Sequence, residues 1–459
     1  MTFEDFILRW MPGNIALVVR FIPELLLYGL AFYICGSKLL RGETLKKTPI
    51  DLLLVAFIFA TAVSIIINGA AIKGSIINLR TIWRYLSVFY IVVNINISNS
   101  ELSKLLSGLK KILFIQALIS SIQYFLPPSF NQAFFAPQDF EVEGFKYPSH
   151  AAAGTLKVGA TAGTFSSSAV LASLLLVAAC IFFAESYISG NSLIPDIAYL
   201  KQLGFTFFGI FASKKRAALV IFLLIPLVLF HSYNRPKKLL SFIWLYAALG
   251  LVCSVLVLMF GSGPSFSSSA SVREEAIPAT EYILQLFSPD YWEASNESAR
   301  GWFVRVIHNA ILSTQSWFGF GPDFDNTQRA ISDTLSTARD IDKLKRDERV
   351  FDDSFWAASV AYFGIIGTAI YAFILKRLYD TARWLCRYGE KPEYKVLGGT
   401  FTTLLAVTVL YAFVERVVRL RTFSFYFWLL AGLVVNMFHV QVNEFKNHRT
   451  HKEIEIAER

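Results

Sequence analysis

Long apolar runs recur along the chain, and the short segments between them hold most of the basic residues. The runs are about 18–22 residues long, which is the length that a helix needs to cross ~30 Å of hydrocarbon. Strands of a membrane barrel would instead alternate apolar and polar residues over ~10 positions, and the sequence lacks this alternation. The pattern predicts eleven membrane-spanning helices, at approximately 14–36, 50–68, 79–97, 108–126, 167–187, 194–212, 217–232, 239–260, 354–375, 396–414 and 422–440.

Composition supports this prediction. Of the 459 residues, 54% are hydrophobic and only 17% are charged, which is too apolar for the surface of a soluble chain of this length. The formal net charge of +9 is explained by membrane topology and not by nucleic-acid binding, because most Lys and Arg residues lie between apolar runs. The four cysteines and six histidines form neither a disulfide framework nor a metal-ligand pattern. The first run carries Arg20 and Glu24, unlike a cleavable signal peptide.

The basic residues predict the orientation of the helices. Alternate connections are rich in Lys and Arg and are expected in the cytoplasm, and they include Arg41, Lys46, Lys47, Lys104, Lys110, Lys111, Arg235, Lys237, Lys238, Lys376, Arg377, Arg383, Arg387, Lys391 and Lys395. This places the amino end outside and the tail, 441–459, inside. The predicted organisation is helices one to eight in 1–260, an extracytoplasmic loop domain in 261–353 and helices nine to eleven in 354–440.

The loop 261–353 is long enough to fold at the membrane surface. Apolar residues recur at helical spacing over 276–287 and again over 302–311, which predicts two amphipathic helices. The stretch 329–350 has charges of mixed sign and is interpreted as a solvated helix or mobile segment. The Ser/Gly-rich stretch 262–271 is interpreted as a linker.

A second set of basic residues faces outward in this topology, against the usual rule. Membrane-proximal cations on that side are unfavourable for insertion and indicate a functional role. Guanidinium groups hold phosphate oxygens in a two-pronged geometry, so an anionic ligand such as a lipid-linked pyrophosphate is expected. The alternative is that long side chains at helix ends simply reach the water. The set comprises Arg80, Arg84, Lys157, Lys214, Lys215, Arg216, Arg300, Arg305, Arg416, Arg419 and Arg421.

Three segments resemble the O-antigen ligase and polysaccharide polymerase (Wzy-type) superfamily, in the order that family uses. Gly163-Thr-Phe-Ser-Ser-Ser-Ala-Val-Leu-Ala172 is similar to the family's Gly-Thr-Phe…Leu-Ala signature. Ala212-Ser-Lys-Lys-Arg216-Ala-Ala-Leu219 resembles its Ser-x-Ser-Arg-Gly-x-Leu motif, with Ala217 in place of Gly. The third segment runs from Arg300-Gly-Trp302 through Gly319-Phe-Gly321 to Asp353-Ser354 and Gly364-Ile-Ile-Gly367. Together these segments span roughly 155–370, about half of the chain.

The third segment departs from the ligase pattern, in which His-Asn precedes Gly-x-x-Gly by nine residues and the His is held to be catalytic. Asp353-Ser354 occupies that position here, with Gly364-Ile-Ile-Gly367 nine residues later. His308-Asn309 makes a second, partial match that ends in Gly319-Phe-Gly321. Asp353 is therefore aligned with the ligase His, with Asp352 as its substitute and His308 as a secondary candidate. This departure favours a chain polymerase over a ligase.

The resemblance implies an all-α, GT-C-like membrane fold in a bacterial inner membrane. It also implies an inverting glycosyltransferase that needs no metal or cofactor. The donor is a glycan on undecaprenyl pyrophosphate, and the acceptor is a sugar hydroxyl on a second lipid-linked repeat unit. Asp353 serves as general base, and pyrophosphate is held by Arg216, Arg300, Arg305, Lys215, Arg80, Arg84, Lys157, Arg416 and Arg419. Membrane lipids are the other implied partners, a chain-length regulator is left open, and nucleic acid is not expected.

Alternatives remain for the function and for single residues. A ligase that transfers glycan to lipid A core or to protein is the runner-up and needs His308 at the site. A secondary transporter or lipid-linked glycan flippase would use the charges inside apolar runs, Arg20, Glu24, Asp196 and Lys201, although neither repeats nor paired broken helices are evident. Asp353-Ser354 is also typical of a helix N-cap.

Overall fold

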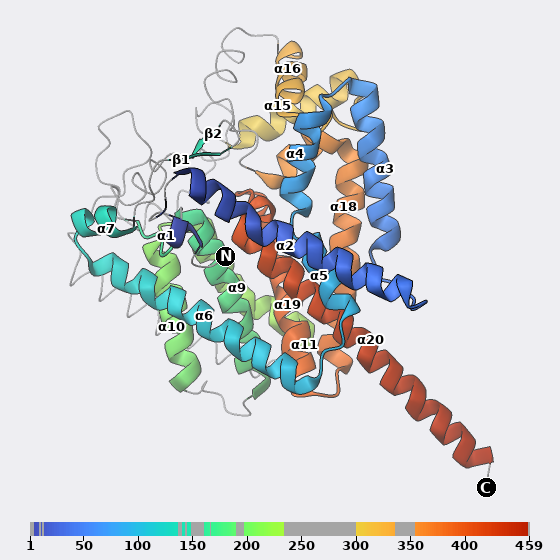
Figure 1. Cartoon of the computed structure of the whole chain (residues 1–459). Coiled ribbons are helices and arrows are strands. Elements are labelled where there is room, and N and C mark those ends of the chain that lie inside the picture. Colours follow the sequence, from blue (N-terminus) through green and yellow to red (C-terminus); the bar gives the residue numbers. More distant parts are fainter. Residues whose placement is uncertain are drawn as a thin grey trace.

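The computed structural model describes residues 4–8, 11, 13–135, 140–142, 145–147, 160–165, 167–189, 197–233, 300–335 and 354–457. In this part of the chain almost all regular structure is helical (Figure 1). The elements are α1 (Glu4–Leu8), α2 (Gly13–Leu40), α3 (Asp51–Asn68), α4 (Ile72–Trp83), α5 (Leu86–Asn94), α6 (Asn99–Phe125), α7 (Pro128–Phe135), the antiparallel strands β1 (Phe140–Val142) and β2 (Phe145–Tyr147), α9 (Ser168–Ser189), α10 (Ile197–Ala212), α11 (Arg216–Tyr233), α15 (Arg300–Thr314), α16 (Phe324–Asp333), α18 (Phe355–Tyr388), α19 (Pro392–Tyr411), the 3-10 turn η3 (Val417–Arg419) and α20 (Arg421–Ala457).

Eight helices of the described part are long and apolar enough to cross a membrane, so the chain is a multi-pass helical membrane protein. They coincide with eight of the eleven predicted spans. The predicted span 79–97 is a pair of helices, α4 and α5, bent by 47° at a short break. The predicted span 194–212 corresponds to α10, which has 16 residues. The predicted span 239–260 lies outside the described residues, so the predicted count of eleven stays a prediction.

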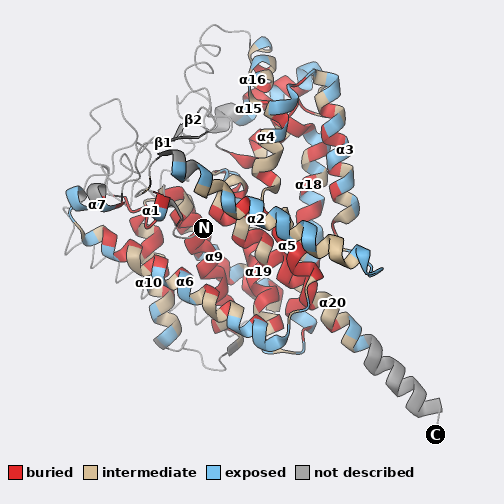
Figure 2. Cartoon of the chain, in the orientation of Figure 1, coloured by how far each residue is buried: buried red, intermediate tan, exposed pale blue. Residues whose placement is uncertain are grey.

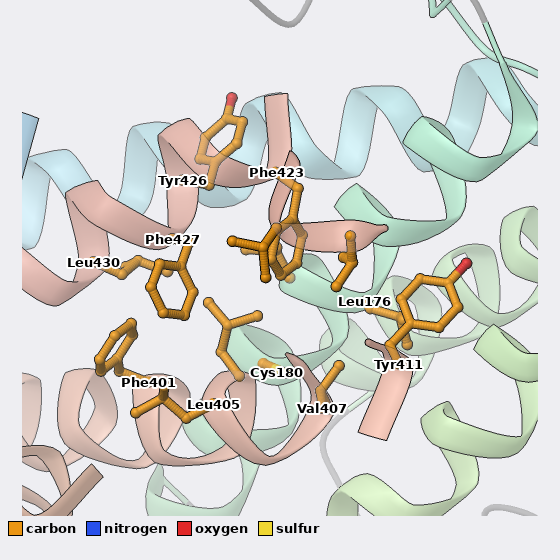
Figure 3. Packing of buried hydrophobic residues seen from close by; sticks show 14 of the residues in the cluster. Leu176, Cys180, Phe401, Leu405, Val407, Tyr411, Phe423, Tyr426, Phe427 and Leu430 are labelled. Carbon is orange, nitrogen blue, oxygen red and sulfur yellow. The ribbon is translucent and has the colours of Figure 1, made fainter. Parts of the chain in front are cut away.

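The centre of the bundle is α9. In its membrane-length segment 89% of the residues are buried, against 6% for α2. Helices α6, α10, α11 and α19 pack around α9, while α2 crosses the outside of the bundle at an angle to the other helices (Figures 1 and 2). Figure 3 shows part of the core, where Phe401 of α19 faces Phe427 of α20 and Leu176 of α9 lies beside Tyr411 and Val407 of α19. The apolar outer faces of α2 and α3 are exposed, as a lipid-facing surface requires.

The long helix α18 is broken at Gly364, which has φ 65° and ψ −171°. The loop before α16 fills the break. Phe320 donates its N–H to the carbonyl of Ala361 at 2.8 Å, and Ile366 donates to the carbonyl of Trp317 at 3.3 Å. These bonds satisfy backbone groups that a kink in an apolar helix would leave unpaired. Gly319 and Gly321 in this loop also have positive φ, 75° and 90°, which glycine adopts more readily than other residues.

The same loop is fastened to the hairpin of α3 and α4 by asparagine side chains. Asn68 donates to the carbonyl of Gly319 at 2.9 Å, and Asn78 donates to the carbonyl of Pro322 at 2.9 Å. Asp323 then caps α16 by accepting from the Asn326 N–H at 3.1 Å. Hydrogen bonds from α3 and α4 therefore hold the loop before α16 against the helical bundle.

The structure tests only part of the predicted loop domain. A helix over 302–311 is confirmed by α15, whose Val306, Ile307, Ala310 and Ile311 are buried. Residues 329–333 of the stretch 329–350 belong to α16. Residues 336–350 lie outside the described residues, as do the predicted helix over 276–287 and the linker 262–271.

Candidate functional site

Three arginines converge on one buried carboxylate, that of Glu24. Arg80 donates from Nε and Nη2 to Glu24 Oε2 at 3.2 and 2.9 Å. Arg84 Nε lies 3.3 Å from Glu24 Oε1, and Arg421 Nε lies 3.6 Å from the same oxygen. We call these four residues the arginine cluster. Among the described residues, these three guanidinium groups share the carboxylate of Glu24.

The arginines come from three places in the fold. Arg80 is in the last turn of α4, Arg84 occupies the break between α4 and α5, and Arg421 is the first residue of α20. Glu24 is on α2 and is only 4% exposed. It is the one buried residue between Val18 and Leu40, all of which the structure describes. Burial of an unpaired carboxylate is strongly unfavourable, so α2 depends on the arginines at this point.

Aromatic side chains and a backbone carbonyl complete the surroundings of the cluster. Arg421 Nε donates to the hydroxyl of the buried Tyr85 at 2.8 Å, and Arg421 Nη2 donates to the carbonyl of Arg20. The guanidinium of Arg80 lies over the ring of Phe21, 5.0 Å from its centroid. Such fixed, partly buried cations bind an anion more strongly than exposed ones because water screens them less.

A second ion pair joins the segment just before α11 to the segment just before Arg421. Lys215 Nζ lies 3.4 Å from Glu415 Oε2. Glu415 belongs to the linker 412–420 between α19 and α20, which we call the α19–α20 linker. Arg416 is exposed on this linker, and Arg419 lies over the ring of Tyr362 with a centroid distance of 5.1 Å. Because the linker leads directly into Arg421, it connects this ion pair with the arginine cluster.

The first two motif segments lie side by side. Thr161 donates its N–H to the carbonyl of Ala212 at 2.9 Å, and its hydroxyl lies 2.9 Å from that of Ser120. The N–H groups of Ala162 and Gly163 both donate to Gln123 Oε1, at 2.9 and 2.8 Å. The buried segment before α9 is thus held against the end of α10, next to Lys214 and Lys215.

The start of α18 meets the α19–α20 linker. Ser354 is the N-cap residue of α18 and makes no capping bond through its side chain. Its hydroxyl instead donates to the carbonyl of Ala412 at 3.4 Å, and Trp356 Nε1 donates to the carbonyl of Val409 at 3.0 Å. The corner that follows Asp353 in sequence therefore lies at the linker that also carries Glu415 and Arg416.

Lys214 has an unusual backbone for its residue type. Its φ is 56°, and its N–H donates to the carbonyl of Phe211 at 3.0 Å where α10 ends. This left-handed position usually holds glycine, and a residue with a Cβ is less stable there by roughly 1 kcal/mol. Burial also lowers the pKa of Lys214 to about 8, because the charged amine loses hydration. Backbone strain and a lowered pKa together mark Lys214 as a functional candidate.

The predicted site residues separate into three groups. Arg80 and Arg84 share Glu24, while Lys215 pairs with the linker that carries Arg416 and Arg419. Arg216 is half-buried at the start of α11, and Arg305 and His308 are exposed on α15. The remaining candidates fall outside what the structure describes, which includes Asp352, Asp353, Lys157 and the side chain of Arg300.

The pairing of Glu24 with the outward arginines was missed by sequence interpretation, which assigned Glu24 to a transport alternative. Glu415 and Tyr85 were not identified either. The signal for Glu24 was an acid inside an apolar run, because such a residue requires a partner from another helix. The sequence contained candidate partners of opposite sign but no local cue for which of them pair with Glu24.

Comparisons with known proteins give no relative from which a role could be transferred. The chain matches no protein-family model. A search of curated proteins also finds no match.

Proposed function

We propose that the chain is a polysaccharide polymerase that transfers a glycan from undecaprenyl pyrophosphate to a sugar hydroxyl of a lipid-linked repeat unit. The observation that carries the proposal is the arginine cluster, whose three guanidinium groups face a single carboxylate. Guanidinium groups match phosphate oxygens in charge and geometry. Three guanidinium groups in one place suit a pyrophosphate, and their place on membrane helices suits one that is attached to a lipid.

In the proposed reaction the acceptor hydroxyl oxygen forms a bond to the anomeric carbon as the bond to the pyrophosphate oxygen breaks. The configuration is inverted, and the hydroxyl proton passes to the carboxylate of Asp353. The leaving pyrophosphate takes up the bonding electrons, and fixed cations stabilise its charge, which often provides the largest part of a rate enhancement. The base contributes typically ~10²–10⁴-fold.

The placement of the motif segments supports the same proposal. The corner after Asp353 contacts the α19–α20 linker through Ser354 and Trp356. The linker reaches Lys215 through Glu415 and continues into Arg421 of the cluster. A base at the corner would thus act on the acceptor hydroxyl, and cations around the linker would act on the pyrophosphate of the donor at the same site. The proposal places this end of the bundle outside the cytoplasm of a bacterial inner membrane.

Lipid-linked oligosaccharides extracted from a deletion strain test the proposal. A polymerase defect leaves single repeat units on the lipid, and complementation restores long chains. Accumulation of long lipid-linked chains in the deletion strain would instead establish the ligase alternative, with His308 as the residue to test next.

Transport of an anionic lipid is a second candidate, favoured by one observation. The break between α4 and α5 carries Arg84, which is paired with an acid from another helix. Broken helices and buried charges of this kind are typical of transport pathways. Purified protein in vesicles distinguishes the two functions, because a polymerase elongates lipid-linked repeat units when donor and acceptor are on the same side of the membrane.

A further inference from the structure

The ion pair between Lys215 and Glu415 connects two segments that are 200 residues apart in the sequence, and its two side chains are unequally buried. Lys215 lies directly before α11, and Glu415 lies on the α19–α20 linker. The side chain of Lys215 is 35% exposed, while that of Glu415 is 15% exposed. The acid is therefore the inner partner of the pair, and the cation is the one that a ligand can reach.

Glu415 stands on a fixed stretch of backbone. Its N–H donates to the carbonyl of Tyr411 at 2.9 Å, where α19 ends. Val414 on one side of it and Val417 two residues later are both buried. A short side chain on a backbone that is held in this way keeps its carboxylate in one place. A lysine ammonium, by contrast, is carried on a flexible stem and takes its position from its partner.

Lys215 is placed where a purely structural cation is unfavourable. Its carbonyl accepts from the N–H of Leu219 at 3.2 Å, so it stands at the start of α11. The helix dipole is positive at this end and favours acidic residues over basic ones. The residues on both sides, Lys214 and Arg216, are basic as well. A cation at such a point indicates a role in binding, and an acid from another segment offsets the repulsion.

The geometry of the pair leaves Lys215 able to bind a further anion. An ammonium group has three N–H donors, and in the described part of the chain Lys215 Nζ directs one of them to Glu415. The separation of 3.4 Å is longer than the ~2.8 Å typical of a charge-assisted hydrogen bond. The pair therefore orients Lys215 without occupying its ammonium group fully. Holding a flexible side chain in place before the ligand arrives lowers the entropic cost of binding.

We propose that Glu415 is a positioning residue, which holds Lys215 toward the pyrophosphate group of a lipid-linked substrate. The inference deepens the proposed function and rests on its use of Lys215 as a pyrophosphate ligand. It requires an effect of opposite sign to that of simple charge. Removal of an acid beside an anion site tightens anion binding if the acid acts only through its charge. Removal of a positioning acid weakens binding instead.

Titration of the purified full chain in detergent, followed by native mass spectrometry, tests this sign. The probe is geranylgeranyl pyrophosphate, a pyrophosphate on a lipid chain, with inorganic pyrophosphate as the free form. Glu415→Gln should weaken binding of the lipid probe by about fivefold or more, a modest size for coupling between two groups. Lys215→Met should weaken it at least as much. In the Lys215→Met background, Glu415→Gln should cause no further weakening, because Glu415 acts through Lys215.

A matched control is Glu185→Gln. Glu185 also forms a partly exposed ion pair between two segments, with Lys110 Nζ at 2.6 Å, and its substitution should leave the affinity for the lipid probe unchanged. Glu415→Asp keeps the charge on a shorter side chain and should weaken binding less than Glu415→Gln does. Thermal midpoints show which variants are folded. If Glu415→Gln does not give a monodisperse protein, Glu415→Asp must still weaken binding.

Unchanged or tighter binding of the lipid probe in folded Glu415→Gln would overturn the inference, because Glu415 would then only support the fold or compete with the ligand. Further weakening by Glu415→Gln in the Lys215→Met background would overturn it too. Equal affinity for the two probes would overturn the assignment to a lipid ligand. The proposed function fails separately. If the deletion strain elongates its glycan normally while Glu415→Gln weakens binding through Lys215, the positioning role stands and the polymerase proposal does not.

Discussion

Gly319 and Gly364 lie with their backbones in direct contact, and each occupies a conformation that favours glycine. Their φ angles are 75° and 65°. A Cβ on Gly319 would lie 2.8 Å from the carbonyl oxygen of Ala361, and a Cβ on Gly364 would overlap the carbonyl of Trp317. The two glycine motifs that were far apart in the sequence therefore form one joint, in which the loop before α16 fills the break in α18.

Substitution at this joint should destabilise the protein severely. We expect Gly319→Ala and Gly364→Ala each to lower the free energy of unfolding by more than about 4 kcal/mol, because overlap with backbone adds to the cost of a positive φ. The yield of monodisperse protein and the thermal midpoint in detergent measure this effect. Gly108→Ala on α6 is the control, since a Cβ there meets nothing within 4 Å and a helical Gly→Ala change is neutral or stabilising. Normal stability of both joint variants would contradict the described contact.

Arg80→Lys should impair chain elongation although it keeps the charge. Arg80 uses two nitrogens on Glu24 Oε2, and a lysine ammonium cannot reproduce this fork. We expect elongation to fall by at least about tenfold, as loss of one charge-assisted hydrogen bond of ~1.5–3 kcal/mol implies. The rate is measured on lipid-linked repeat units at matched expression. Lys376→Arg, at an exposed i,i+4 pair with Asp380, should leave the rate unchanged.

Asp353→Asn should separate a catalytic base from a helix cap. The N-cap position of α18 belongs to Ser354, so the substitution should leave the thermal midpoint unaltered. If Asp353 is the general base, elongation falls by ~10²-fold or more. Full activity of Asp353→Asn combined with loss of activity in His308→Ala would move the base to His308 and favour the ligase alternative.

Lys214 should make stability depend on pH above neutrality. Its pKa of about 8 in the folded chain lies below the ordinary value of 10.5, so between these values the unfolded chain binds more protons at this group. Stability should therefore rise as the pH increases from about 8 toward 10.5. Lys214→Gly removes this contribution and relieves the left-handed backbone, which should raise the free energy of unfolding by up to about 1 kcal/mol at pH 7. Thermal midpoints at pH 7, 8, 9 and 10 check both effects.

Reporter fusions test the orientation on which the proposed function depends. A fusion at residue 300 should report the extracytoplasmic side, and a fusion at residue 385 should report the cytoplasm. The same compartment for both positions would contradict the predicted topology and with it the outward placement of the arginine cluster.

Hydropathy predicted the membrane helices well because each apolar run must satisfy the same physical demand, burial of a hydrogen-bonded backbone in lipid. It did not predict the break at Arg84 and Tyr85. Hydropathy is averaged over a window as long as a membrane span, and two residues change that average very little. The kink at Gly364 was equally hidden, since glycine is common in membrane helices and the partner that fills the kink is 45 residues earlier in the chain, at Gly319.

The candidate site was predictable only as a set of residues. Outward cations stood out by sign and position, so Arg80, Arg84 and Arg421 were identified individually. Their convergence on Glu24 depends on how α2, α4 and α20 pack, and no local pattern encodes that packing. The contact between Ser354 and Ala412 likewise joins segments whose sequence separation gives no local cue.

The attachment of α2 through Glu24 has a consequence for biogenesis. Arg421 and Arg20 are 401 residues apart, and Arg421 begins the helix that follows every other described element. While the ribosome is still making the middle of the chain, Glu24 lacks one of its three arginines, and a buried carboxylate without its full set of partners is unfavourable. We therefore expect the amino-terminal helix to dock after synthesis of α20 begins. Membrane proteases that cleave partly assembled chains would then recognise an undocked α2. Formation of the ion cluster would end this exposure, because Glu24 has all three arginines only after α20 is in place.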